Sequence, residues 1–289
     1  MIFKKQQTNY FVLLILLVVA IWTWSVIFSQ GDQFLEVIFF DVGQGDAIFI
    51  ETPRGQQILI DGGPDKTILE KISREMPFYD KKIDLVILTH PDADHLTGLI
   101  SILEHYQIGH IISSGLEKDT ATYDRWRDLI EDKNIPLTLA QSGQKIIFQE
   151  DLFLEILWPD QSLINSFSNK ANNVSVVGRL IYGQTEFLLT GDIEKKVESY
   201  LIDHLPVEKL ESDIFKASHH GSKTSNSQNF LKIIDPEAAI ISVGADNRFK
   251  HPDSVVLDRL SDTRLFRTDQ NGNIKFLTDG NVVEIKPQR

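Results

Sequence analysis

The sequence predicts an α/β domain in which two β-sheets pack against each other and helices cover the outside. Three observations favour this class. Short apolar runs alternate with amphipathic stretches of helical length. Turn sequences such as GQG (43–45) and PRG (53–55) separate successive runs. Clusters of polar, reactive side chains follow the ends of several runs, which is where α/β folds usually place their sites.

The first half of the domain is expected to begin with three strands and to continue with alternating helices and strands. The run DLVILT (84–89) is almost entirely apolar, which is typical of a strand buried on both faces. Leucines and isoleucines recur at helical spacing in 95–105, so a helix should follow this strand closely. The expected strands are 34–40, 46–52, 56–61, 84–89 and 110–113, and the expected helices are 66–74, 95–105 and 122–133.

The second half is expected to add further strands and covering helices. No repeat, low-complexity tract or linker interrupts residues 34–289, so a single domain is the simplest interpretation. The expected strands are 145–148, 151–157, 174–182, 185–190, 213–217, 237–243, 264–268, 273–278 and 281–286, and the expected helices are 193–204, 227–234 and 253–260.

An apolar stretch with only two polar interruptions precedes this domain at residues 10–28. At 1.5 Å per residue its length matches the roughly 30 Å hydrocarbon core of a bilayer. Lys4 and Lys5 lie before the stretch, so the positive-inside rule puts the N-terminus in the cytoplasm. The expected organisation is a cytoplasmic segment at 1–9, a single-pass transmembrane anchor at 10–28 and an extracytoplasmic domain at 34–289. A cleaved signal peptide is the alternative, but the stretch is longer than a usual signal-peptide core, and no clear cleavage site follows it.

The composition restricts the chemistry. The chain has no cysteine, which excludes disulfides, a thiolate nucleophile and cysteine-ligated metal sites. Any metal must therefore be held by His, Asp, Glu or Asn. The formal net charge of -12 argues against a broad electrostatic surface for nucleic acid.

Four side chains that can each bind a metal follow the strand at 84–89: His90, Asp92, Asp94 and His95. An extended segment would turn positions 90, 92 and 94 to one side, and entry into the next helix would bring His95 back toward them. The alternative is that one aspartate caps the helix while the histidines are solvated. Capping explains one acid and leaves the other potential ligands unexplained.

Two further clusters would complete a metal site. The stretch FLLTGD (187–192) is an apolar strand that ends in Asp192, and IFKASHHGS (214–222) is a strand followed by His219 and His220. Alone, the first is a common turn and the second a common pair of solvated histidines. Together with HPDADH (90–95), these strand ends could close around two metal ions with Asp192 shared between them.

The order of these motifs resembles the metallo-β-lactamase superfamily: THxDxDH, then TGD, then a strand followed by HHGS. Flanking motifs narrow the resemblance to the C-terminal hydrolase (nuclease) domain of the ComEC family of competence DNA-uptake proteins. They are FFDVGQGDAIFI (39–50), DGG (61–63), NNVSVVGRL (172–180) and SVGADNRFKHP (242–252). The resemblance spans about residues 34–288, and the motifs are specific as an ordered set, whereas each alone would be a weak signal.

The resemblance implies an αββα sandwich with a two-metal site in the groove between the sheets. It assigns His90 and Asp92 to one metal, Asp94, His95 and His219 to the other, Asp192 to both, and Asp61 to orienting the ligands. His219 is preferred to His220 because members of the superfamily commonly place this ligand first after the strand. The histidine that usually completes the first metal site is missing, and Asn172 and Asn173 occupy that region.

Other residues near the motifs are expected to act on the substrate. Asp94 and His220 are expected to take part in catalysis. The expected substrate contacts are Asn173, Ser222, Lys223 and His251. The alternative is that these side chains only orient loops through hydrogen bonds or are solvated.

Aspartate at position 92, where many relatives have histidine, makes the site oxygen-rich and suited to harder ions, so two divalent ions are expected, Mn²⁺ or Zn²⁺. Two such ions would lower the pKa of a bridging water, present hydroxide and clamp the attacking and leaving oxygens. The expected function is a membrane-anchored, extracytoplasmic hydrolase of phosphodiester bonds. By resemblance it is a ComEC-like nuclease of DNA uptake, with single-stranded DNA the favoured substrate and a competence channel an expected partner.

Two alternatives remain. The same site could hydrolyse phosphocholine esters of cell-wall polymers, or carboxylic esters and lactones, which the acidic composition favours. The domain could also be a non-catalytic, metal-bearing module of a DNA-uptake complex, as the missing histidine suggests.

Overall fold

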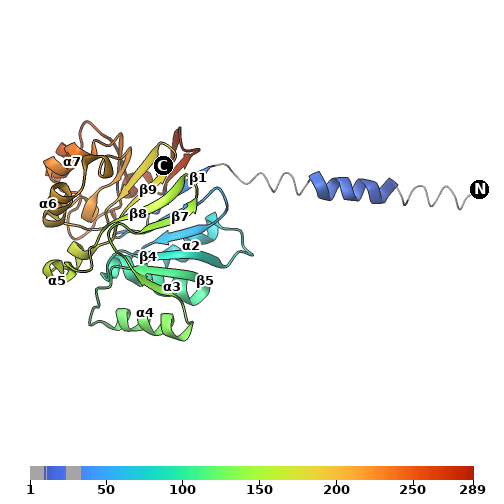
Figure 1. Ribbon diagram of the computed structural model, residues 1–289, viewed down its shortest axis with the longest axis horizontal. Helices are drawn as coiled ribbons and strands as arrows, with labels where there is room; N and C mark the ends of the chain where they lie inside the picture. Colours follow the sequence, from blue (N-terminus) through green and yellow to red (C-terminus); the bar gives the residue numbers. More distant parts are fainter. Residues whose placement is uncertain (1–9, 11, 24–33) are drawn as a thin grey trace, which may run out of the picture.

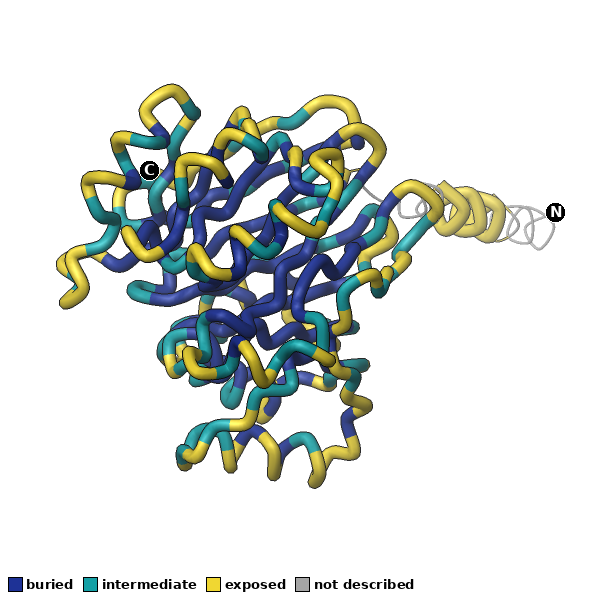
Figure 2. Tube along the Cα trace, turned by 60° about the vertical axis from the view of Figure 1, so that its left-hand side comes forward, coloured by how far each residue is buried: buried dark blue, intermediate teal, exposed yellow. Residues whose placement is uncertain are grey.

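A computed structural model of the chain describes Tyr10, residues 12–23 and residues 34–289 (Figure 1). Within 34–289, two β-sheets lie face to face and helices cover their outer sides. The strands form the buried interior, and the exposed residues gather on loops and outer helix faces (Figure 2). This is the layered α/β architecture that the alternating apolar runs predict.

The first sheet has eight strands in the order β15-β14-β1-β2-β3-β4-β5-β6. Their bounds are β1 (Leu35–Phe39), β2 (Ile48–Glu51), β3 (Gln57–Ile60), β4 (Lys82–Leu88), β5 (Gln107–Ser113), β6 (Leu137–Leu139), β14 (Ile274–Thr278) and β15 (Val283–Pro287). Leu85 and Ile87 of β4 pack between the sheets, whereas Val86 and Leu88 pack under the outer helices. Residues 84–89 are therefore buried on both faces, as their apolar run predicts.

The second sheet has seven strands in the order β13-β12-β11-β10-β9-β8-β7. Their bounds are β7 (Lys145–Gln149), β8 (Leu152–Trp158), β9 (Val177–Tyr182), β10 (Thr185–Leu189), β11 (Ile214–Lys216), β12 (Ala238–Ile241) and β13 (Arg264–Arg267). β10, β11, β12 and β13 are parallel to their neighbours in this series, so their C-terminal ends lie at one edge of the sheet.

The outer helices bury one apolar face each. The first sheet is covered by α2 (Thr67–Glu75), α3 (Ala93–His105) and α4 (Ala121–Asp132), and the second by α6 (Lys195–His204), α7 (Gln228–Ile234) and α8 (Ser254–Arg259). Short helical segments are α5 (Ile164–Phe167), α9 (Thr268–Asn271), η1 (Ala171–Val174), η2 (Val207–Lys209) and η3 (Ser218–Gly221). α3 packs against both α2 and α4, which fixes the start of α3 against the sheet.

The directions of the strands bring the predicted motifs close together in space. β3 and β4 are parallel, and so are β10 and β11. The C-terminal ends of each pair therefore lie at the same edge of their sheet, and a motif follows each end. Asp61 follows β3, His90 follows β4, Asp192 follows β10 and His220 follows β11. All four side chains belong to one cluster, because the candidate ligand groups that they form share members.

The described part of the N-terminal stretch is helical at residues 12–23. In the ranges that the structure describes, no helix combines the length and apolarity needed to cross a membrane. Residue 11 and residues 24–28 of the predicted anchor at 10–28 lie outside the described residues. The whole of the predicted cytoplasmic segment at 1–9 also lies outside them. The anchor therefore stays a prediction.

Candidate metal centre

The centre is built where three loops meet through their backbones. The Gly62 N–H donates to the His95 carbonyl oxygen at 2.8 Å, and the Asp46 N–H donates to the Asp94 carbonyl oxygen at 3.2 Å. A Cβ on Gly45 would lie 2.2 Å from that same Asp94 oxygen, so only glycine allows this approach. The GQGD and DGG turns therefore lock the start of α3 in place.

Three buried imidazoles form the centre of the site: His90, His95 and His220. The ring centroids of His90 and His95 are 4.2 Å apart, and those of His95 and His220 are 5.4 Å apart. Among the described residues, none of the three Nε2 atoms has a hydrogen-bond partner. Buried nitrogens left unpaired are costly, and a cation that accepts their lone pairs removes that cost.

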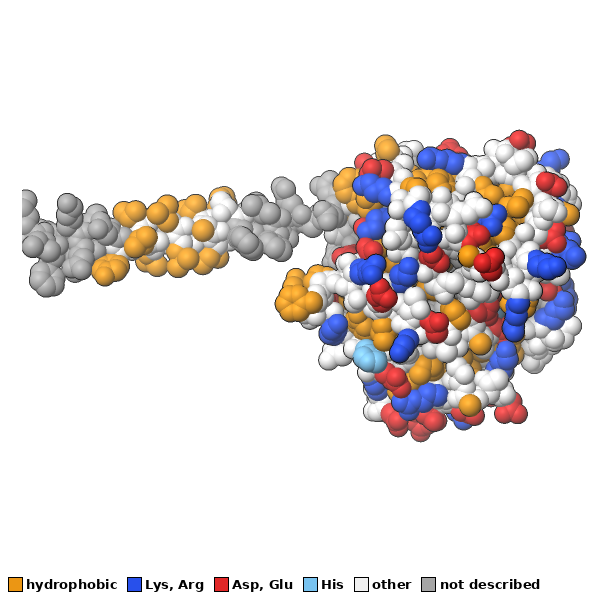
Figure 3. Space-filling model, turned by 180° about the vertical axis from the view of Figure 1, so that it is seen from behind, with side chains coloured by type: hydrophobic (Ala, Val, Ile, Leu, Met, Phe, Trp, Pro, Cys, Tyr) orange, Lys and Arg blue, Asp and Glu red, His pale blue; other side chains and the backbone are white. Residues whose placement is uncertain are grey.

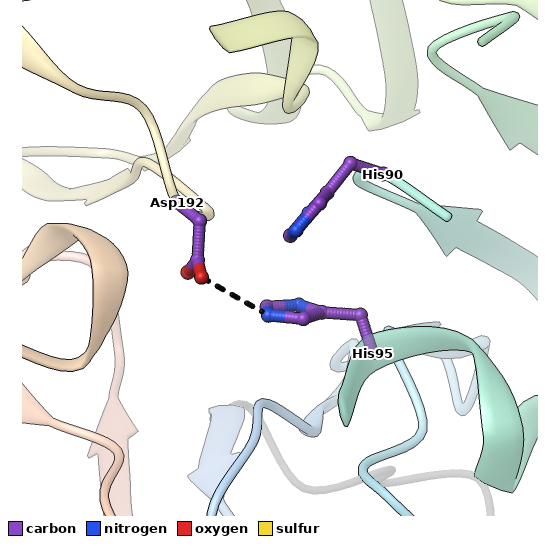
Figure 4. A group of neighbouring side chains, drawn as sticks. All are labelled: His90, His95 and Asp192. Atoms are coloured by element: carbon purple, nitrogen blue, oxygen red, sulfur yellow. Dashed lines mark ion pairs between the residues drawn. The ribbon is translucent and has the colours of Figure 1, made fainter. Parts of the chain in front are cut away.

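Figure 4 shows the Asp192 carboxylate beside the His90 and His95 rings, with its ion pair to His95. Asp192 Oδ2 lies 3.4 Å from His95 Nε2 and 3.3 Å from His220 Nε2, and Asp94 Oδ2 lies 3.4 Å from His220 Nε2. The groups whose ligand atoms lie within 4.8 Å of one another are His90–His95–Asp192, Asp94–His95–His220, Asp46–Asp192–His220 and Asp46–Asp61–His95. Imidazole nitrogens and carboxylate oxygens together suit divalent ions, and the overlap of these groups leaves room for two neighbouring sites.

The other side of each ring is held by hydrogen bonds. Asp61 Oδ2 lies 2.7 Å from His95 Nδ1, and Asp61 also accepts bonds from the backbone N–H and hydroxyl of Thr89. The Nδ1–H of His220 donates to the Ser242 carbonyl oxygen at 2.9 Å. These contacts put the proton on Nδ1 and leave Nε2 as the ligand atom. Asp61 thus has the orienting contacts that the sequence predicts for it.

His90 is held in the same way by two hydroxyls. Its Nδ1 lies 3.1 Å from Thr89 Oγ1 and 3.2 Å from Ser175 Oγ. Ser175 also accepts a bond from the Asp192 backbone N–H at 3.2 Å. This one serine therefore links Asp192, which follows a strand of the second sheet, to His90, which follows a strand of the first. Ser175 lies in the NNVSVVGRL motif but was not singled out from the sequence.

The ionisation of the cluster follows from burial and from mutual charge. Burial lowers the pKa of His220, but the carboxylates of Asp192 and Asp46 outweigh it, so this pKa lies well above its usual value. Burial and the charge of His95 lower the pKa of His90 to about 4. For Asp192, burial raises the pKa, yet the two neighbouring imidazoles hold it well below its usual range. Without a metal the cluster thus keeps its carboxylates ionised, and a divalent ion that binds His220 Nε2 would displace the proton that these carboxylates favour on the ring.

Asp46 and Lys216 form a buried ion pair beneath the cluster, and sequence reasoning missed this role. Lys216 Nζ lies 2.5 Å from Asp46 Oδ2, 3.0 Å from the Gly191 carbonyl oxygen and 3.8 Å from Asp192 Oδ1. Both side chains are almost fully buried. Asp46 was read as the first residue of a strand at 46–52, but β2 begins at Ile48, which leaves Asp46 in the turn facing the site. Its position in the GQGD motif was the available signal.

The structure places His220, and not His219, in the cluster. Both residues have left-handed backbone conformations, with φ of 52° each, so the chain curls after β11 and the second ring turns inward. The His219 ring instead contacts the Asn172 amide and the Thr224 hydroxyl. This differs from the sequence assignment, in which His219 was the ligand and His220 a catalytic group.

Asp92 lies at the margin of the cluster. Its Oδ2 is 3.7 Å from His90 Nε2, and its Oδ1 is 2.6 Å from Lys118 Nζ. It belongs to none of the tight ligand groups found among the described residues. The structure therefore brings four of the six predicted metal ligands together, His90, Asp94, His95 and Asp192. His220 takes the place of His219, and Asp92 lies at the edge of the cluster.

The predicted substrate contacts fall in different places. His251 lines the cavity above the cluster. The amide oxygen of Asn173 accepts the Glu194 backbone N–H inside the protein, and Asn172 lines the cavity instead. The hydroxyl of Ser222 pairs with that of Thr224, and Lys223 is exposed beside Asp253 at 3.9 Å. Neither Ser222 nor Lys223 lines the cavity.

The cluster opens into a cavity of about 650 Å³. Asp94, Asp192 and His220 lie in its wall, together with the cationic side chains of Lys118 and Arg248. Two cationic side chains, together with any bound metal, would provide positive charge in this wall. The cavity is also large enough for a ligand that carries negative charge.

Replacing His220 with glutamine is expected to lower metal affinity by at least about a hundredfold, because it removes a ligand nitrogen that faces two carboxylates. His219→Gln, the matched control, should leave metal affinity nearly unchanged. Metal content after equilibrium dialysis against Mn²⁺ or Zn²⁺ measures both. The reverse ranking of the two variants would contradict the arrangement seen in η3.

Comparison with known proteins shows the family to which the motifs point. The profile of the metallo-beta-lactamase superfamily matches residues 40–245. ComE operon protein 3 of Bacillus subtilis is 30% identical over 261 residues, covering 83% of this chain and 33% of that protein. Competence protein ComA of Neisseria gonorrhoeae is 28% identical over 248 residues, covering 83% of this chain and 32% of that protein. The chain thus spans about one third of the length of these relatives, and it resembles the ComEC family as its motifs predict.

Solved structures show the same fold. The metallo-beta-lactamase fold protein YhfI of Bacillus subtilis aligns with a TM-score of 0.56 at 11% identity, covering 84% of this chain and 99% of that one. CmlA, a diiron beta-hydroxylase of Streptomyces venezuelae, aligns with a TM-score of 0.50 at 12% identity, covering 81% of this chain and 52% of that one. At these identities the likeness concerns the fold alone.

Proposed function

The chain belongs to the metallo-beta-lactamase superfamily, and from this membership we propose that it is a metal-dependent phosphodiesterase that cleaves DNA, with single strands preferred. One observation carries the proposal. Three buried Nε2 atoms without hydrogen-bond partners among the described residues converge with the shared carboxylate of Asp192 beside a cavity whose wall carries both acidic and basic side chains. Divalent ions bound there would supply Lewis acidity and an activated water.

The chain's own residues divide the remaining work. His90, His95, His220, Asp94 and Asp192 would hold the ions through Nε2 and carboxylate oxygens. The hydrogen bonds to Nδ1 keep the rings from rotating, so the ligand atoms stay aimed at one point.

Two cations extend the site toward the substrate. Arg248 lies in the same cavity wall, where it can contact the oxygens of a phosphodiester, and Lys118 lies there too, paired with Asp92 at 2.6 Å. The face of the domain in Figure 3 shows Lys and Arg interspersed with Asp and Glu and no broad basic area. With a net charge of -12 on the chain, we expect recognition to depend on these local charges and on the metals.

A competence relative motivates the choice of DNA as substrate, and the N-terminal residues motivate the proposed location. One of them is named a competence protein, and we extend that context to this chain as a nuclease acting in DNA uptake beside a competence channel. The apolar helical residues 12–23, with lysines before them, support a membrane-anchored enzyme whose domain lies outside the cytoplasm.

The test compares substrates for the full chain in detergent with Mn²⁺ or Zn²⁺. We expect cleavage of a single-stranded oligonucleotide that a chelator abolishes and that Asp94→Ala lowers by at least about a hundredfold. The net charge of -12 favours the second candidate, hydrolysis of phosphocholine or carboxylic esters. Turnover of those esters without turnover of DNA would establish that candidate, and bound metal without any turnover would indicate a non-catalytic module.

A further inference from the structure

We propose that Phe249 is a stacking platform for an unpaired nucleobase beside the metal centre, and that it makes the site selective for single-stranded nucleic acid. The inference rests on the proposed nuclease function. It adds to that function the part of the site that contacts the bases of the substrate.

Phe249 is an apolar ring in a polar cavity. It lines the same cavity as Asp94 and His220, and 49% of its surface is exposed. A phosphate or a metal ion does not bind to an apolar ring, whereas the flat face of a base can stack on it. The ring therefore matches the part of a nucleotide that the charged groups leave unbound.

A series of neighbouring rings leads from Phe249 to the metal centre, in which the Phe249–His251 pair is stacked and the later pairs lie edge to face. The rings of Phe249 and His251 are nearly parallel, at 14°, with centroids 5.8 Å apart, and the His251 and His219 centroids are also 5.8 Å apart. The His219 ring is in turn 6.2 Å from that of His220. The guanidinium of Arg248 lies over the Phe249 ring, 4.7 Å from its centre, so a base would stack on the other face of the ring. Aromatic rings for the bases and a cation for the backbone are the two elements of single-strand binding sites.

The loop that carries Phe249 is held in shape before any ligand binds. The Asn247 amide donates to the carbonyl oxygens of Gly244 at 3.0 Å and His251 at 2.7 Å, and its oxygen accepts the His251 N–H at 3.0 Å. Gly244 packs against Gln44, where a Cβ would lie 2.6 Å from the backbone nitrogen. Such pre-organisation lowers the entropy lost when a base stacks on the ring.

The charges around Phe249 favour a base over the rival ligand for an aromatic ring. A choline ammonium also binds aromatic faces, but Arg248 beside the ring would repel it while attracting a phosphate. In a duplex each base face is already covered by its neighbours, so stacking on Phe249 requires an unpaired base. Selectivity for single strands follows.

The experiment measures cleavage by the full chain of two oligonucleotides with equal length and charge, one with bases and one abasic. Phe249→Ala and Phe249→Leu should lower kcat/KM for the base-containing strand about 10- to 100-fold and leave the abasic strand unaffected. Phe249→Tyr keeps a ring and should retain most of the activity. Phe78→Ala, which removes an 87% exposed aromatic before β4, at the other end of the domain, is the matched control and should change neither substrate.

A second readout does not need turnover. Fluorescence anisotropy of both labelled strands is measured in an Asp94→Ala background, with and without Phe249→Ala, and only the base-containing strand should bind more weakly. Equal losses on both strands, no loss on either, or a loss confined to a phosphocholine ester would overturn the platform. Failure of the wild-type chain to cleave any oligonucleotide would refute the nuclease function, while the binding comparison would still decide the platform.

Discussion

Replacing Asp192 with alanine is expected to lower kcat/KM for phosphodiester hydrolysis by about a thousandfold, which corresponds to about 4 kcal/mol of lost transition-state stabilisation. The effect is large because this one carboxylate approaches both His95 and His220, and it belongs to two of the four ligand groups. Its removal should therefore loosen both metal positions at once. Steady-state kinetics with saturating Mn²⁺ or Zn²⁺, together with metal content by mass spectrometry, measures the change.

Asp128→Ala is the matched control, because Asp128 is an exposed aspartate on α4 that takes no part in the site. It should retain wild-type activity and metal content. An Asp192→Ala enzyme that kept two equivalents of metal and most of its activity would show that Asp192 is not the shared ligand.

Replacing Lys216 with methionine is expected to lower the free energy of unfolding by about 3–5 kcal/mol, because it leaves Asp46 as a buried charge without its partner. Burial lowers the pKa of Lys216, but Asp46 and Asp192 outweigh it and raise this pKa, so the lysine carries its charge in the folded protein. The loss is a large part of the 5–15 kcal/mol that is typical of a folded domain. Urea denaturation of the full chain in the presence of a chelator measures it without a contribution from bound metal.

Arg74→Met provides the comparison for this variant. Arg74 pairs with Glu70 on α2, and both side chains are more than half exposed. Loss of such a surface pair should change stability by no more than about 1 kcal/mol. Equal effects of the two substitutions would show that the Lys216–Asp46 pair is compensated in some other way.

The sequence predicted the architecture well because strand signals here are strong and local. β4 ends in the apolar run LVIL (85–88), and α3 follows it with apolar residues at helical spacing, so both elements were found near their observed bounds. β6 was missed, since it is a three-residue edge strand whose Leu137 and Leu139 are largely exposed and show no buried face.

The site was predicted less completely, because its details depend on backbone turns that residue types do not reveal. The exchange of His219 for His220 follows from two successive left-handed residues after β11. Asn173 turns its amide inward to the Glu194 N–H, so the neighbouring asparagine reaches the cavity instead. Asp46 was hidden because a strand was expected to begin two residues too early.

The direction of the strands places the start of the domain and the metal cluster at opposite ends of the first sheet. β1 runs parallel to β3 and β4, since β2 is antiparallel to both β1 and β3. Leu35 therefore lies at the end of the sheet where β4 begins, a strand length of about 23 Å from the end where His90 lies. If the chain is anchored before Leu35, as proposed, the anchor lies at the end of the sheet opposite the metal cluster, and a substrate would reach the cluster from the free end of the domain.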